Sequence, residues 1–138
     1  MPSRGIRSNN PGNLDHNPSV KWAGELPFDA DIEPRFCRFE SAVYGIRALC
    51  KVLLTYQRKY KVCTIAGIIV RWAPAVENNT RAYIDSVAKA CGIKSDQTIL
   101  IESYLPKLAK AIIMHENGSQ PYSDETINAA VHLALGGK

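Results

Sequence analysis

The sequence has 138 residues, 46% of them hydrophobic and 22% charged, which is ordinary for a globular protein with enough chain for one hydrophobic core. The net charge of +4 suits an acidic partner such as a cell-wall polymer, nucleic acid or a phospholipid surface. The basic residues are spread along the chain, so no nucleic-acid-binding tract is predicted. No apolar run predicts an integral membrane segment or the core of a signal peptide.

Four cysteines, Cys37, Cys50, Cys63 and Cys91, lack the C-x-x-C spacing and the nearby histidine pair that are typical of zinc sites. Cys50 and Cys91 fall within helical patterns, where a free cysteine acts as a small apolar residue. We therefore expect reduced thiols, no metal and no cofactor.

The N-terminal segment, residues 1–34, is predicted to be rich in loops because Asn, Gly and Pro are dense in its first half. Trp22 either covers the core or offers a platform on which a sugar stacks. An acidic cluster, Asp29, Asp31 and Glu33, predicts a solvated loop rather than a metal site. Alternating basic and apolar residues at 35–39 predict a short half-buried strand that pairs with residues 21–23 as a small hairpin.

Helices are predicted through most of residues 41–135, which form the helical core of a single, mainly α domain (1–138). Apolar spacing and capping residues place them at 41–60, 65–72, about 80–91, about 104–116 and about 124–135. Ser41 and Thr64 are the expected N-caps of the first two. Pro106 is expected in the first turn of the fourth helix, where proline is tolerated. Gly45 lowers helix stability, which indicates close packing at that point.

Glu116 ends the fourth predicted helix, directly before Asn117-Gly118, and Tyr122 follows six residues later. The negative helix end and apolar neighbours both disfavour an ionised carboxylate, as a general acid near neutral pH requires. The other interpretation is a surface glutamate in a last helical turn. His115 is expected to point elsewhere, toward the surface.

Several motifs carry a resemblance: Arg-Gly-Ile-Arg at 4–7 with Asn-Asn-Pro-Gly-Asn at 9–13, Tyr-Gly-Ile-Arg at 44–47, Arg-Trp-Ala-Pro at 71–74, and Glu-Asn-Asn-Thr at 77–80 before Tyr83. Together they resemble a phage and prophage family labelled virion structural proteins. The likeness covers residues 4–134. It implies a protein made in the host cytoplasm and carried in the virion with other virion proteins.

A more distant likeness is to peptidoglycan glucosaminidases and lytic transglycosylases of the lysozyme-like superfamily. Their catalytic glutamate ends a helix that precedes an Asn-Asn loop. Here residues 112–122 look like the acid-bearing helix of phage lysozymes but follow the loop in the sequence. The likeness therefore implies a lysozyme-like fold with a small hairpin, circularly permuted, with Glu116 as the acid.

That resemblance implies cleavage of the β-1,4 bond between N-acetylmuramic acid and N-acetylglucosamine in the peptidoglycan of the periplasmic wall. Glu116 would protonate the leaving oxygen, and Glu40 and Glu77 are the candidates for a second carboxylate. A lytic transglycosylase needs neither, since one glutamate serves as acid and then base. The residues expected to bind substrate are Asn10, Asn13, Tyr83, Tyr122 and Trp22.

The rival interpretation is a non-catalytic structural or wall-binding virion protein on a lysozyme-like scaffold. An enzyme requires Glu116 in a groove facing residues 9–13, whereas a structural protein predicts Glu116 on a flat or interface surface. Nucleic-acid binding, a third interpretation, predicts a continuous face of Lys and Arg.

Overall fold

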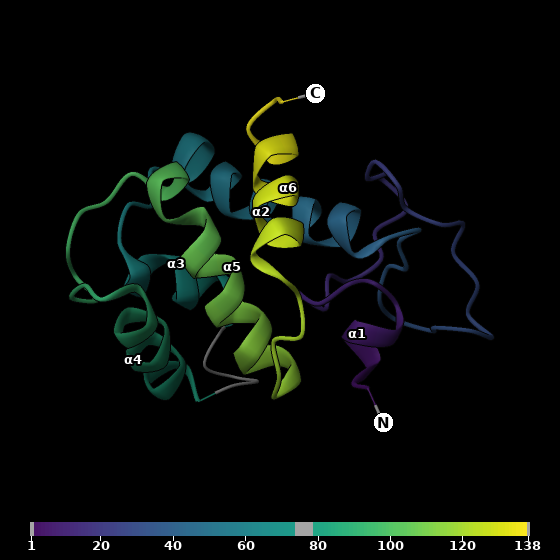
Figure 1. Ribbon diagram of the computed structural model, residues 1–138, viewed down its shortest axis with the longest axis horizontal. Helices are drawn as coiled ribbons and strands as arrows, with labels where there is room; N and C mark the ends of the chain where they lie inside the picture. Colours follow the sequence, from purple (N-terminus) through teal and green to yellow (C-terminus); the bar gives the residue numbers. More distant parts are fainter. Residues whose placement is uncertain (1, 74–78, 138) are drawn as a thin grey trace.

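A computed structural model describes residues 2–73 and 79–137. Within them the chain forms the helices α1 (Arg4–Arg7), α2 (Ala42–Tyr60), α3 (Ile65–Trp72), α4 (Thr80–Cys91), α5 (Ile101–Asn117) and α6 (Asp124–Ala134). Helices α2 to α6 gather into one body, and the N-terminal segment lies against one side of it (Figure 1). The mainly helical class predicted from the sequence is confirmed.

Helix α2 runs through the centre and packs against α5 and α6. Its apolar residues recur at helical spacing, and Ile46, Leu49 and Leu53 are fully buried. The helix ends where Lys61 adopts a left-handed conformation (φ 61°). The close packing predicted at Gly45 is confirmed, because a Cβ there would lie 1.7 Å from the carbonyl oxygen of Asn9.

The other helices begin and end largely where capping residues indicate. Thr64, Asn79 and Ser123 each accept a backbone N–H bond at the start of α3, α4 and α6, which satisfies a donor that has no partner within the helix. Gly92 and Gly118 end α4 and α5 in left-handed conformations (φ 70° and 73°), as glycine does most readily.

Helix α5 starts at Ile101, three residues earlier than predicted, so Pro106 lies inside it and not in its first turn. The reason is a cap supplied by another helix. The Gln57 side chain accepts from the Ile101 N–H at 2.8 Å and donates to the Ile99 carbonyl at 3.0 Å.

The predicted hairpin is wrong in its details, because no regular strand forms in residues 2–73 or 79–137. Two isolated antiparallel bridges join Phe36 to Asp15 and Phe39 to Glu25 instead. Residues 35–39 thus pair with two separate segments, neither of which is the predicted 21–23.

The prediction of a solvated acidic loop is wrong for Glu33. Asp29 and Asp31 are exposed, but Glu33 is only 4% exposed. Its carboxylate forms a bidentate ion pair with Arg4 and accepts the N–H groups of Arg35 and Phe36 at 2.7 and 2.8 Å.

Candidate functional site around Glu116

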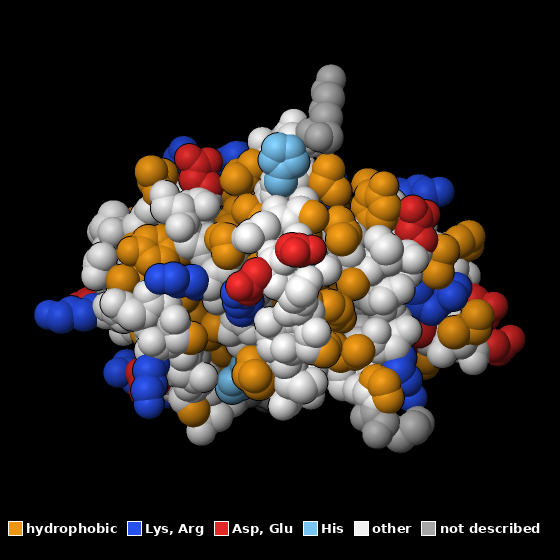
Figure 2. All heavy atoms as spheres, viewed as in Figure 1, with side chains coloured by type: hydrophobic (Ala, Val, Ile, Leu, Met, Phe, Trp, Pro, Cys, Tyr) orange, Lys and Arg blue, Asp and Glu red, His pale blue; other side chains and the backbone are white. Residues whose placement is uncertain are grey.

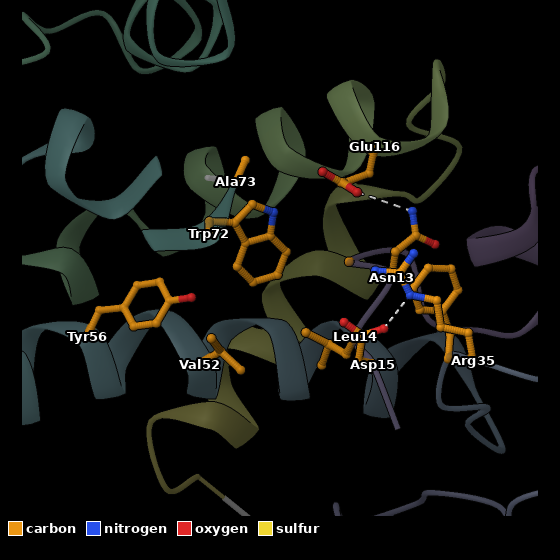
Figure 3. A pocket seen from close by; sticks show the side chains of 11 residues that line it. Asn13, Leu14, Asp15, Arg35, Val52, Tyr56, Trp72, Ala73 and Glu116 are labelled. Carbon is orange, nitrogen blue, oxygen red and sulfur yellow. Dashed lines mark hydrogen bonds and ion pairs between the residues drawn. The ribbon is translucent and has the colours of Figure 1, made fainter. Parts of the chain in front are cut away.

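Glu116 is the penultimate residue of α5 and is half-buried. Its side chain lines a pocket of about 550 Å³ at the junction of α2, α3, α5 and the N-terminal segment. Figure 3 shows Glu116 on one wall of this pocket, opposite Val52, with Asn13 beside it. Glu116 therefore faces the loop of residues 9–13, which the enzymatic interpretation requires of it.

Both carboxylate oxygens of Glu116 accept hydrogen bonds. The Tyr83 hydroxyl donates to Oε2 at 2.9 Å, and the Asn13 side-chain amide donates to Oε1 at 3.2 Å (Figure 3). Asn13 has a left-handed backbone (φ 51°), a conformation that asparagine tolerates better than most residues. The carboxylate therefore joins α4, α5 and the N-terminal loop.

Tyr83 bonds Glu116 from the protein interior and not from the open side of the pocket, since the Tyr83 side chain is fully buried. Burial, followed by the nearby Glu116 charge, raises the pKa of Tyr83 well above its usual value. The phenol therefore stays protonated and available as a donor. Its ring stacks on that of the exposed His115, with centroids 3.6 Å apart.

Asn117 fixes the end of α5 to the N-terminal segment. Its amide donates to the Pro11 carbonyl at 2.7 Å, and its oxygen accepts from the Ser3 hydroxyl at 2.5 Å. Gly5 leaves room for this contact, because a Cβ there would lie 2.5 Å from the Asn13 Oδ1 and 2.8 Å from the Asn117 Oδ1. Asn117 therefore sets the position of the loop relative to Glu116.

The far walls of the pocket bear residues to which the sequence analysis assigned no role. Trp72 and Tyr56 contribute aromatic rings, and Asp15 is a second carboxylate in the same pocket, bound to Arg35 at 2.7 Å (Figure 3). Asp15 lies two residues after Asn13, and that proximity in sequence is the one signal that could have identified it.

A second pocket of about 530 Å³ shares Val52 and Tyr56 with the first. It adds Trp22 and Tyr60, and the guanidinium of Arg71 lies 3.8 Å from the centroid of the Tyr60 ring. The two pockets therefore lie next to each other, and aromatic and basic side chains line both.

Comparison with known proteins gives one informative match. No protein-family model matches the chain. Protein P5 of Pseudoalteromonas phage PM2 is 42% identical over 127 residues, which are 91% of this chain and 78% of the phage protein. The chain belongs to the family of phage PM2 protein P5. The phage family indicated by the sequence motifs is thereby supported.

Two of the predicted substrate-binding residues of this P5-family chain have other places in the structure. Asn10 is fully buried, and its side chain bonds the backbone of Leu14 and Cys37. Tyr122 packs against the helical core, and its hydroxyl is buried without a hydrogen-bond partner in the described residues. Neither lines the Glu116 pocket.

Of the two candidates for the second carboxylate, Glu40 does not line the Glu116 pocket. Glu40 is exposed and lines another pocket, together with Arg4 and Arg38. Glu77 lies outside the described residues. Trp22 is half-buried against a small cluster around Phe39 and also lines the second pocket, so both roles considered for it are compatible with its position.

The surface of this P5-family chain bears both charges. On the face in Figure 2, Lys and Arg side chains are scattered among acidic and apolar ones, without a continuous basic band. None of the helices in residues 2–73 and 79–137 is long and apolar enough to cross a membrane.

Proposed function

We propose that this protein is a virion-associated enzyme that degrades peptidoglycan, with Glu116 as its acid–base residue. The observation that carries the proposal is the placement of one half-buried carboxylate in a groove, oriented by Tyr83 and Asn13. Membership of the family of a phage protein supports association with the virion.

The surroundings of Glu116 give its two contacts different roles. Both oxygens of Glu116 accept hydrogen bonds, so an oxygen that carries a proton and donates it to a sugar must first give one of these bonds up. Asn13 lines the pocket and makes the longer bond, while Tyr83 is buried behind it. A sugar that displaces the Asn13 amide and excludes water would leave Glu116 anchored by Tyr83 and able to carry a proton.

Cleavage would then follow the usual course for glycosides. Glu116 transfers its proton to the bridging oxygen as the C–O bond breaks, and the sugar develops oxocarbenium character. Glu116 next accepts a proton from the attacking hydroxyl. That hydroxyl belongs to water in a lysozyme and to the sugar itself in a lytic transglycosylase, so a hydrolase yields a reducing end and a transglycosylase an anhydro end.

The groove suits a polysaccharide. The rings of Trp and Tyr have a flat apolar face and a polar group at the edge, so they can stack on a sugar and also bond its hydroxyl groups. Trp72, Tyr56 and Trp22 line the two adjacent pockets. Asp15 offers the pocket a second negative charge near a developing cation.

Lysozyme-like architecture is part of the proposal, although α1 and the end of α6 lie at opposite edges of Figure 1, so a simple permutation would need a linker between them.

The test is turbidity loss of purified peptidoglycan with wild type, Glu116→Gln and Glu102→Gln. Glu102 is an exposed glutamate in the first turn of the same helix and serves as the matched control. We expect Glu116→Gln to lose activity by about 100-fold or more, while Glu102→Gln stays near wild type and circular dichroism shows both folded.

Two results would overturn the proposal. The first is a folded Glu116→Gln protein that retains wild-type activity. The second is folded wild type without activity on walls of several types. If that inactive protein still co-sediments with peptidoglycan, the non-catalytic wall-binding interpretation is favoured.

A further inference from the structure

The geometry points to a divalent transition-metal site, best suited to Zn²⁺, formed by His16, Glu25 and Cys37. The three ligand atoms lie within 4.8 Å of one another. Each comes from a different pass of the N-terminal segment. Because they stand 9 and 12 positions apart in the sequence, they match no short zinc motif, and the sequence alone predicted no metal.

The distances suit tetrahedral coordination. His16 Nδ1 and Glu25 Oε2 are 3.5 Å apart. Two ligands that each bind zinc at about 2.0–2.1 Å in a tetrahedron lie about 3.3 Å apart, and a sulfur at about 2.3 Å lies about 3.5 Å from either. The Cys37 sulfur lies within 4.8 Å of both atoms, so metal binding requires it to move closer to them.

The hydrogen bonds of His16 and Glu25 leave their ligand atoms available, and Cys37 would give up only its weak bond to the Asp15 carbonyl on losing its proton. Glu25 uses Oε1 to accept the Trp22 N–H at 3.0 Å, and its Oε2 faces His16. His16 Nδ1 is buried without a hydrogen-bond partner in the described residues. An unsatisfied buried nitrogen is costly, and a metal ion would satisfy it together with the neighbouring carboxylate and thiolate.

The surroundings explain what a metal would add. Among residues 2–73 and 79–137, Cys37, Phe39 and Ala48 form the buried part of the local apolar cluster, which is a small core for a segment without regular strands. Segments of this kind commonly depend on metal ions for stability. A metal here would bind three passes of chain together and hold in place the wall that carries Asp15 and Arg35.

The ligand set and its access favour zinc over other common ions. Thiolate and imidazole ligands select zinc, whereas magnesium and calcium prefer oxygen alone. A pocket of about 180 Å³, lined by His16, Glu25 and Phe28 among others, reaches the site from the surface. It provides an entry path and room for water as a fourth ligand.

The metal-free alternative is a simple ion pair of protonated His16 with Glu25, beside a buried thiol that donates to the Asp15 carbonyl at 3.6 Å. Titration of chelator-treated, reduced full-length protein with Co²⁺ distinguishes the two. We expect one equivalent to bind with the near-ultraviolet band of a thiolate–cobalt bond. Zn²⁺ should displace the cobalt and raise Tm in a concentration-dependent way.

Matched variants locate the site. Cys37→Ser should abolish the band, and His16→Gln should weaken Co²⁺ binding by about tenfold or more, while Cys63→Ser retains wild-type behaviour because Cys63 lies outside the cluster. If Cys37→Ser does not fold, the His16→Gln titration carries the test. The absence of a thiolate band with wild type, a band that only Cys63→Ser removes, or a Tm unaffected by Zn²⁺ would overturn the site.

Discussion

The helical body and the N-terminal segment are held together by different forces. Helices α2 to α6 share one large apolar core, in which many side chains, among them Leu105, Leu108 and Ile112, are fully buried. Burial of each such side chain contributes about 1.5–3 kcal/mol. The stability of this body is therefore distributed over many similar contacts.

Residues 8–40 depend instead on a few polar side chains that bond the backbone. Asn9 donates to the Phe39 carbonyl, and Asn10 bonds the backbone of Leu14 and Cys37. The Glu33 carboxylate accepts hydrogen bonds from the Arg4 side chain and from two backbone N–H groups. These side chains satisfy backbone N–H and carbonyl groups and hold neighbouring passes of chain together, as the backbone hydrogen bonds between paired strands do in a β-sheet. Single polar substitutions should therefore lower stability far more in this segment than at most helical surfaces.

Gly45→Ala tests the contact between the two regions and should have the largest effect. In a free helix alanine is about 1 kcal/mol better than glycine. Here the new Cβ would lie 1.7 Å from the Asn9 carbonyl oxygen, and backbone cannot move aside cheaply. We expect destabilisation of about 3 kcal/mol, with new proteolytic cleavage confined to residues 8–40, measured by urea unfolding and mass spectrometry.

Gly67→Ala in α3 is the control, because its Cβ would meet only side-chain atoms, at 3.0 and 3.1 Å. Its stability should change by less than about 1 kcal/mol. Equal effects of the two substitutions would show that the contact between α2 and the Asn9 carbonyl does not join the regions.

Asn10→Ala tests whether buried polar groups stabilise the N-terminal segment. The side chain makes three hydrogen bonds, to the Leu14 N–H and carbonyl and to the Cys37 carbonyl. Loss of these bonds leaves buried backbone groups unsatisfied, and we expect a cost of about 2–3 kcal/mol in urea unfolding. Asn17→Ala, at an exposed turn, should change stability by about 0.5 kcal/mol or less; similar losses in both would contradict the comparison.

The helical body could be predicted from the sequence better than the N-terminal segment, because its elements depend more on local signals. Apolar periodicity and caps located α2 and α3 to within a residue, because their signals are local. The start of α5 depends on Gln57, 44 residues away, and no local pattern contains that information. The burial of Glu33 was mispredicted for the same reason, since it depends on Arg4, 29 residues distant.

In the candidate site, too, one feature depends on a local signal and the others depend on long-range contacts. The end of α5 directly after Glu116 follows from Asn117-Gly118, so the position of the carboxylate was predictable. Its hydrogen bonds to Tyr83 and Asn13 span 33 and 103 residues. Asp15 and Trp72 enter the pocket only through tertiary packing. The sequence thus indicated Glu116, and the resemblance named Tyr83 and Asn13 as groove residues, but neither predicted that these two bond to Glu116 or that Asp15 and Trp72 line its pocket.

The smallest effect is expected from Glu33→Gln, because glutamine keeps an oxygen that can accept the N–H groups of Arg35 and Phe36 and because the Arg4 side chain is itself 43% exposed, which weakens the lost ion pair. The hydrogen bond from Arg4 lowers the pKa of Glu33 from 4.5 to about 2. A carboxylate with a lower pKa in the folded than in the unfolded state stabilises the fold fully above about pH 4.5 and loses this contribution as the pH falls toward 2. Wild type should therefore lose stability across that window more steeply than Glu33→Gln, in thermal unfolding at a series of pH values.

Asp31→Asn provides the control, since Asp31 is an exposed acid two residues away. It should keep the wild-type slope between pH 4.5 and 2, because solvent-exposed carboxylates contribute little to stability. If Glu33→Gln also kept that slope, the ion pair with Arg4 would not be what holds residues 33–36 against α1, and the stability of the segment would have to come from its apolar cluster around Phe39.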